Sequence, residues 1–351
     1  MGSSQISDSA EEDIPVPVRA RDAWEPTSPF RPHPLLQGGH VQTIASFVLP
    51  RKIHLPPAEE RLVEVTPGIK VRCWCRWQSE RKEDRLTLIV VHGLEGSTES
   101  QYMTGVARHA LSAGMNVVLM NQRNCGGMDH YAPTLYNSSL SSDVAAVACN
   151  IIENDGVSKF ALAGFSMGGN LVLKLAGEWG KNAPPEFRAV AAVCPAIDLA
   201  ASADALHEPA NRIYEWYFLM QLYRRFRGKV KLFPNDFDRE RLRGVTSLRL
   251  FDDRVTAYYC GFTGADDYYA RAAAANVIDR IAVPALILHA ANDPFIRVRP
   301  ETRERILANP NITYIEPADG GHCAFVGQGN GDGDDGRWAE HEIVEFVERF
   351  A

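Results

Sequence analysis

The sequence predicts an α/β fold with a mostly parallel central sheet, helices on both faces of that sheet and a helical insertion. Short continuous apolar runs recur from residue 86 onward, and segments with helical spacing lie between them. Strands that are apolar throughout are buried on both faces, which is typical of a parallel sheet covered by helices. Residues 199–262 break the alternation, because they contain no good strand and many aromatic side chains.

In chain order, β-rich runs predict strands at residues 61–65, 71–77, 86–91, 116–120, 160–163, 189–193, 285–289 and 312–315. The first two precede any helical pattern, so we expect them to form an antiparallel edge. Helical spacing predicts one helix over 101–112 and another from 142 to 153, with Asp143 in its first turn. A terminal helix is expected over about 337–350.

The insertion at 199–262 lies between two predicted strands, so we expect it at the carboxyl edge of the sheet, where α/β sheets bind ligands, acting as a lid. Its aromatic residues line an acyl pocket or attach the lid to the core, and the second interpretation is favoured for any individual residue. Residues 1–34 are rich in Ser, Pro, Asp and Glu and lack periodicity, so this segment is expected to be mobile or to lie on the surface. Residues 35–351 are expected to form one domain.

Composition and charge exclude several classes of protein. Hydrophobic residues make up 45% of the 351 residues, which is ordinary for a globular protein. The formal net charge of −7 argues against a nucleic-acid binder. No apolar run reaches the length of a membrane span, and residues 281–291 are interrupted by Pro284. The first ten residues resemble neither a secretory signal nor a myristoylation signal. Seven scattered cysteines suggest buried, reduced thiols, so we expect a cytoplasmic location.

A candidate nucleophile lies at the turn from the predicted strand at 160–163 into a helix. Residues 164–168 read Gly-Phe-Ser-Met-Gly, and apolar residues with helical spacing follow. A serine on such a sharp turn has strained backbone angles, and glycines two residues before and after it relieve the crowding. The helix that follows directs its positive dipole end at any anion formed there. This context predicts that Ser166 is a nucleophile.

A serine nucleophile needs a base oriented by an acid, and in this architecture the chain order is Ser, acid, His. His322 follows two glycines in the loop after the last predicted strand, so it is the predicted base. His289 lies inside an apolar strand and is expected to be buried, and His109 is expected to be a surface residue of a helix.

Asp293 is the predicted acid, because it lies in an Asn-Asp-Pro-Phe loop at the carboxyl end of the strand at 285–289. Its competitor is Asp198, which follows the preceding strand. For Asp198 we favour a different role, the N-cap of the first insertion helix.

An oxyanion needs two preorganised N–H donors. The first is expected from the amide of Met167, next to the nucleophile. The second is expected from Leu94 in the His-Gly-Leu-Glu-Gly-Ser loop at 92–97, where Gly93 permits the bend. His92 precedes the serine, so we expect it to orient this loop by hydrogen bonding rather than to act as the base.

These motifs together resemble the YheT-like (embryogenesis-associated protein) branch of the α/β-hydrolases. The resemblance rests on residues 92–97, 164–170 (Gly-Phe-Ser-Met-Gly-Gly-Asn), 292–295 and 320–325 (Gly-Gly-His-Cys-Ala-Phe). It extends to the upstream segment 32–43, with Gly-Gly-His-Val-Gln-Thr at 38–43, and to 121–127. It covers roughly residues 31–350 and implies an α/β-hydrolase fold, a Ser166–Asp293–His322 triad and hydrolysis or transfer of acyl esters, often medium-chain or lipid-like. The sequence departs from the family pattern at two places. Asn124 stands where many relatives have glycine, and residues 327–336 look like a loop added between the predicted base and the last helix.

Two further patterns are discounted. Residues 327–336 are rich in Gly and Asp, as calcium loops are. Counted from residue 330, however, the sixth position is not glycine and the twelfth is not glutamate, as a calcium loop requires, so a solvated flexible loop is expected. A cluster of five cations could favour anionic membrane surfaces, but we interpret it as a helix end that complements the dipole. The cluster consists of Arg224, Arg225, Arg227, Lys229 and Lys231.

The sequence therefore predicts a serine carboxylic ester hydrolase that forms an acyl-enzyme from a small-molecule acyl ester. One alternative is an alcohol O-acyltransferase that uses the same acyl-enzyme, and another is a non-catalytic binding protein with this fold. No metal or organic cofactor is implied, and no nucleic-acid partner or transmembrane segment is expected. Peripheral membrane contact and the oligomeric state stay open.

Overall fold

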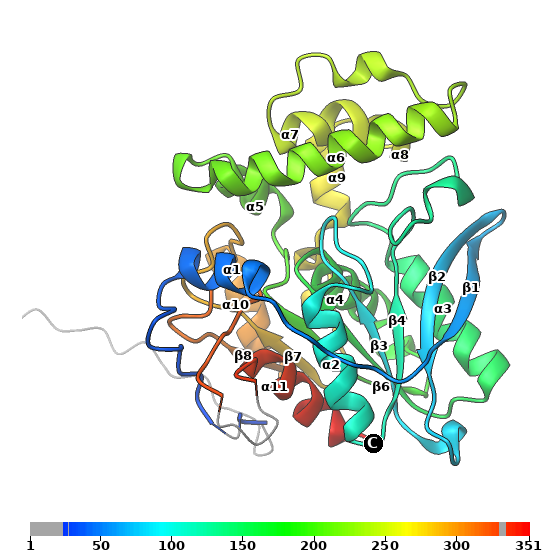
Figure 1. The fold of residues 1–351 in the computed structure, drawn as a ribbon, viewed down its shortest axis with the longest axis vertical. Coiled ribbons are helices and arrows are strands. Elements are labelled where there is room, and N and C mark those ends of the chain that lie inside the picture. The colour runs from blue at the N-terminus through cyan, green and yellow to red at the C-terminus, as the bar shows by residue number, and fades with distance from the viewer. Residues whose placement is uncertain (1–23, 27, 330–334) are drawn as a thin grey trace, which may run out of the picture.

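The computed structural model describes residues 24–26, 28–329 and 335–351 (Figure 1). Most of the predicted surface segment at 1–34 and the middle of the loop at 327–336 lie outside the described residues. Among the residues that are described, no helix is both long and apolar enough to cross a membrane.

One eight-stranded sheet organises the molecule, with strand order β1-β2-β4-β3-β5-β6-β7-β8. Strands β1 and β2 are antiparallel to each other and β2 is antiparallel to β4, whereas β3 to β8 pair in parallel. The predicted antiparallel edge and parallel body of the sheet are therefore confirmed. The strand bounds are β1(Glu59–Thr66), β2(Ile69–Arg76), β3(Thr87–Val91), β4(Asn116–Met120), β5(Phe160–Phe165), β6(Phe187–Val193), β7(Ala285–Leu288) and β8(Ile312–Ile315).

The central strands are apolar throughout because both of their faces are buried. In β3, Leu88 and Val90 pack into the core on one face, whereas Ile89 and Val91 pack into the core on the other. Helices α2(Gln101–Ser112) and α11(Trp338–Glu348) cover the first face. Helices α3(Ser141–Asp155) and α4(Met167–Trp179) cover the second, and α10(Pro300–Ala308) packs against the edge strand β8.

A helical insertion connects β6 to β7 and stands over the carboxyl edge of the sheet (Figure 1). It contains α5(Leu199–Leu206), α6(Arg212–Leu232), α7(Leu248–Phe251), α8(Ala257–Cys260) and α9(Ala265–Ala272). A single π-helical turn, Asp252–Thr256, joins α7 to α8. The helical material therefore extends ten residues beyond the predicted end at 262.

The N-terminal region is anchored by aromatic contacts where it is described. Trp24 packs edge-on against Phe346 of α11, with ring centroids 5.7 Å apart, and Phe30 packs against Phe325 and Trp338. A short helix follows, α1(Gly39–Val48), which the sequence analysis did not predict. This helix matters for the site described below.

One expectation about individual residues needs correction. Cys149 is exposed, although the cysteines as a group were expected to be buried. The cation cluster lies in the last turns of α6, as the favoured interpretation expected, but two of its members make contacts inside the protein. Arg225 donates to both carboxylate oxygens of Glu95, and Lys229 is fully buried and donates to the carbonyl oxygens of Asp129 and Ala132. Burial lowers the pKa of Lys229 to about 8. These two cations hold α6 to the loops after β3 and β4.

Candidate active site

Ser166 lies at the turn between β5 and α4 with φ 54° and ψ −117°, which is a strained backbone conformation for a residue with a side chain. The two flanking glycines are required by close packing. A Cβ atom on Gly164 would lie 2.3 Å from the carbonyl oxygen of Gly168, and one on Gly168 would lie 2.3 Å from that of Val91. The local sequence therefore forces this turn and presents Ser166 at the carboxyl edge of the sheet.

His322 and Asp293 meet at the same edge, as the sequence analysis predicted from their loops. His322 Nδ1 and Asp293 Oδ2 are 2.8 Å apart. The other carboxylate oxygen, Oδ1, accepts hydrogen bonds from the backbone amides of Phe295 and Ile296 at 3.1 and 2.9 Å. The Asp293 side chain is fully buried and is therefore held in one orientation by three hydrogen bonds.

The electrostatics of this pair favour an ionised carboxylate beside a basic imidazole. Burial alone would raise the pKa of Asp293, but the neighbouring His322 lowers it to a net value below its ordinary range. Burial likewise would lower the pKa of His322, but the carboxylate of Asp293 raises it to a net value above its ordinary range. A histidine with this partner is suited to accept a proton and to hold it transiently.

The N-terminal helix α1 holds the loop that carries His322. Thr43 Oγ1 accepts a hydrogen bond from the backbone amide of His322 at 2.8 Å, and Asn292 Oδ1 accepts one from Gly321 at 3.1 Å. Gly39 packs so closely that a Cβ atom there would lie 1.9 Å from the carbonyl oxygen of Asn292. The Gly-Gly-His-Val-Gln-Thr motif is visible in the sequence, but nothing near it in the sequence indicates this role for Thr43.

Ser166 and His322 line one cleft of about 480 Å³. Within the described chain, no hydrogen bond joins these two side chains, and His322 Nε2 lies 3.8 Å from Cys323 Sγ. Catalytic hydrogen bonds of unliganded enzymes are often long and shorten only when substrate is bound. The walls of the cleft come from α1, the loop after β3 and α6, and include Ile44, Phe47, Tyr217 and Phe218.

The loop after β3 is held rigidly beside Ser166. The amide of Gly93 donates to Tyr102 Oη at 3.0 Å, and the amide of Glu95 donates to Tyr136 Oη at 3.1 Å. The amide of Leu94 lies between these two amides in the chain. In the part of the chain that the structure describes, it has no hydrogen-bond acceptor. The amide of Met167 is the first of α4 and has no partner within the helix. These are the two donors that the sequence analysis named for an oxyanion.

His92 is buried and hydrogen-bonded within the same loop system. Its Nε2 accepts from the amide of Gln122 at 3.1 Å, and its Nδ1 lies 2.8 Å from the carbonyl oxygen of Gly93. Burial lowers the pKa of His92 to about 4, so its ring is neutral at pH 7.

Next to Gln122, Arg123 forms a buried ion pair with Asp143, with both oxygens of the carboxylate engaged. The Asn-Gln-Arg motif therefore supports the loop and does not enter the cleft.

Asp198 does not approach His322. It occupies the N-cap position of α5, but its side chain makes no cap hydrogen bond, so that part of the prediction is wrong. Instead its carboxylate accepts from the backbone amide and Nε of Arg299 and from Thr302 Oγ1. The side chain ties the insertion to α10, a contact between segments about 100 residues apart.

Three groups of His, Cys and Asp side chains have possible metal-ligand atoms within 4.8 Å of one another among the described residues. Two of these groups contain His322 or Asp293, whose facing atoms are already hydrogen-bonded to each other. In the third, Asp335 accepts hydrogen bonds from Arg51 and Arg108, which compete with any cation. We therefore assign no metal to these groups.

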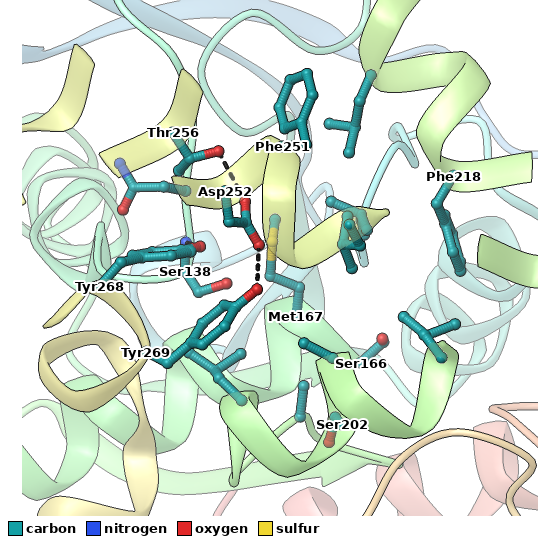
Figure 2. A pocket seen from close by; sticks show the side chains of 18 of the residues that line it. Ser138, Ser166, Met167, Ser202, Phe218, Phe251, Asp252, Thr256, Tyr268 and Tyr269 are labelled. Atoms are coloured by element: carbon teal, nitrogen blue, oxygen red, sulfur yellow. Dashed lines mark hydrogen bonds between the residues drawn. The ribbon is translucent and has the colours of Figure 1, made fainter. Parts of the chain in front are cut away.

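A second, smaller cavity of about 100 Å³ opens from Ser166 beneath the insertion (Figure 2). Its wall is mostly apolar and includes residues of α5, α6 and α7, with Met167 and Phe251 among the contributors. It also contains the carboxylate of Asp252, which accepts hydrogen bonds from Thr256 Oγ1 and Tyr269 Oη, each at 2.7 Å. The sequence analysis did not identify Asp252, and no local motif marks it.

The chain is similar to known protein sequences over much of its length. The chain is 29% identical over 290 residues to the putative esterase YheT of Escherichia coli, covering 82% of this chain and 84% of that protein. It is 25% identical to the embryogenesis-associated protein EMB8 of Picea glauca, covering 91% of this chain and 72% of that protein. It is 27% identical to the mouse phospholipase ABHD3, covering 69% of this chain but only 59% of that protein.

Solved structures share the fold. An esterase from Pyrococcus furiosus superposes with a TM-score of 0.56 at 16% identity, covering 86% of this chain and 98% of that one. An esterase from Pyrobaculum calidifontis superposes with a TM-score of 0.55 at 17% identity, covering 89% and 90%. The family model for the alpha/beta hydrolase fold matches residues 87–327, which is more than half of the chain. The chain therefore belongs to the α/β-hydrolase family, and within it to the YheT-like branch.

Proposed function

We propose that this protein is a serine esterase that hydrolyses carboxylic esters through an acyl-enzyme. One observation carries the proposal: His322 is hydrogen-bonded to the buried Asp293 and shares a cleft with Ser166, which lies on a strained turn. The names of the relatives, which include esterases and a phospholipase, support an ester substrate.

In this mechanism, His322 Nε2 removes the proton of Ser166 Oγ as the oxygen attacks the ester carbonyl carbon. The negative charge that develops on the carbonyl oxygen is bound by the amides of Leu94 and Met167, and loss of one such donor costs about 3–4 kcal/mol of transition-state stabilisation. As the carbon–oxygen bond of the ester breaks, the imidazolium gives its proton to the leaving alcohol. Asp293 keeps the proton of the neutral ring on Nδ1 and stabilises the imidazolium.

Water then attacks the acyl-enzyme while His322 accepts one of its protons. The second tetrahedral intermediate collapses to the carboxylic acid, and the proton returns to Ser166 Oγ. Every step uses side chains and backbone amides of the protein together with solvent water, so the mechanism as written requires no cofactor. An alcohol in place of water would give ester transfer instead of hydrolysis, from the same acyl-enzyme.

The test is hydrolysis of p-nitrophenyl esters of two to twelve carbons by the wild-type protein and by Ser166→Ala. We expect turnover by the wild type only, with identical circular dichroism spectra, and labelling of Ser166 by a fluorophosphonate probe. Retained turnover in the variant would remove Ser166 from the mechanism. Absence of both labelling and turnover in the wild type would favour a binding protein. Analysis of the products in added ethanol separates hydrolysis from acyl transfer.

A further inference from the structure

Two cavities meet at Ser166, which lines both of them. His322 lines the larger cleft and does not line the smaller cavity, whereas Met167 lines the smaller cavity and not the cleft. If His322 protonates the leaving oxygen, the alcohol portion must lie in the cleft. The acyl portion then enters the smaller cavity beneath the insertion. This assignment rests on the proposed esterase function.

That smaller cavity is not a simple apolar acyl pocket, because Asp252 faces it. Figure 2 shows the carboxylate between Thr256 and Tyr269, on the same side of the cavity as Tyr268. The Thr256 hydroxyl donates a hydrogen bond to one carboxylate oxygen, and the Tyr269 hydroxyl donates one to the other, each at 2.7 Å. A carboxylate accepts about four hydrogen bonds, so two positions are left for a ligand. Asp252 lies in a π-helical turn, a geometry that occurs frequently at functional sites.

In the part of the chain that the structure describes, no Lys, Arg or His side chain forms an ion pair with Asp252. Arg249, the described cation that lowers the pKa of Asp252, is itself paired with Asp204 and Asp266. Burial raises the pKa of Asp252 to about 6, although Tyr269, Thr256 and Arg249 lower it in part. The group is thus mainly ionised at pH 7. A partly buried carboxylate with unused acceptor positions costs free energy unless a donor from a ligand satisfies it.

We propose that Asp252 selects short acyl esters whose acyl chain carries a hydrogen-bond donor, either a hydroxyl or an ammonium group. The apolar wall near Ser166 accepts the methylene groups of such a chain, and the carboxylate accepts a hydrogen bond from its donor. An unsubstituted alkyl chain of the same length leaves the carboxylate without that partner. The small volume of the cavity, about 100 Å³, restricts the chain to a few carbon atoms.

The experiment compares kcat/KM for ethyl esters in matched pairs, with acid release followed by titration. The pairs are 3-hydroxybutanoate against butanoate, 6-hydroxyhexanoate against hexanoate, and 6-aminohexanoate against hexanoate. For at least one pair, the wild type should prefer the donor-bearing ester by about 10-fold or more, the range for a hydrogen bond to a charged group. The hydroxy and amino esters distinguish a neutral donor from a cation.

Asp252→Asn should reduce that preference by about 10-fold or more, because the side chain keeps its size but loses its charge and one acceptor. Asp253→Asn is the matched control, since Asp253 is exposed and lines neither cavity, and it should keep the wild-type preference. If Asp252→Asn does not fold, Asp252→Glu replaces it. The longer side chain displaces the carboxylate by about one carbon–carbon bond and should change which hydroxy ester is preferred.

A wild type that hydrolyses butanoate and hexanoate esters but prefers none of the donor-bearing esters overturns this proposal and leaves the esterase function intact. The same holds if the preference exists and Asp252→Asn or Asp252→Glu leaves it unchanged. A wild type that hydrolyses none of the esters overturns the proposed function itself, so the two failures are distinguishable.

Discussion

Replacing Asp293 by asparagine tests the arrangement of the proposed triad most directly. One oxygen of Asp293 accepts hydrogen bonds from two backbone amides, and the other faces His322 Nδ1 at 2.8 Å. In the Asp293→Asn variant, the side-chain amide oxygen must remain opposite the two backbone donors, because an NH₂ group there would face N–H groups. The NH₂ group therefore points at His322 Nδ1.

A donor at that position binds only the unprotonated form of Nδ1, so the proton of the neutral ring moves to Nε2. This is the nitrogen that would have to accept the proton of Ser166. The base is then present in the wrong tautomer, and the stabilisation of the imidazolium is lost as well. The same exchange in a serine-protease triad lowers kcat about 10⁴-fold, which corresponds to about 5.5 kcal/mol, and we expect a fall of that size here.

The assay is p-nitrophenyl ester hydrolysis at pH 7 to 8, with kcat and KM determined separately and thermal unfolding as a check on folding. The matched control is Asp198→Asn, a buried aspartate at the carboxyl end of the adjacent strand β6. It should retain kcat within a few fold, although loss of charge beside Arg299 should lower the melting temperature. If Asp198→Asn rather than Asp293→Asn abolishes turnover, the assignment of the acid is wrong.

Three further predictions concern the supports of the site. Thr43→Val removes the acceptor for the His322 amide. Steady-state kinetics should show that kcat falls about 10-fold with little change in KM. An altered KM with a normal kcat would contradict this positioning role of Thr43. Although burial lowers the pKa of His322, the adjacent carboxylate raises it above the ordinary 6.5. The base must be neutral to act, so kcat/KM should rise with pH through a midpoint above 6.5. A plateau already reached at pH 6 would refute the raised pKa of His322. Gly168→Ala places a Cβ atom 2.3 Å from a carbonyl oxygen of β3 and should lower the melting temperature by many degrees. Gly228→Ala lies near the C-terminal end of α6, where a Cβ atom meets open space, and should raise the melting temperature slightly. Equal effects in calorimetry would show that the turn at Ser166 tolerates a methyl group.

The strands could be predicted to within two residues because of how they are buried. A strand covered on both faces is a continuous apolar run bounded by turn residues, and that pattern is local. The Ser166 turn could be predicted for a similar reason, since the crowding that requires Gly164 and Gly168 arises within a few residues of the chain and from the strand beside it.

The features that the sequence did not reveal depend on contacts between distant segments. Helix α1 begins with two glycines in a proline-rich region, and its contacts with the loops at 292 and 322 help to hold it in place. The side chain of Asp198 bonds to Arg299, which local capping rules cannot anticipate. Asp252 faces the cavity only because the insertion folds back over Ser166, so nothing near it in the sequence marks its position.

The hydrogen bond from His322 to Thr43 joins residues 279 positions apart, and it has a consequence for synthesis of the protein. A ribosome makes Thr43 before Ser166, and it makes His322 only after strand β8. A nascent chain thus contains the serine long before it contains the imidazole that would activate it. By the proposed mechanism, ester cleavage can begin only after the loop at 322 has been made and has returned to helix α1.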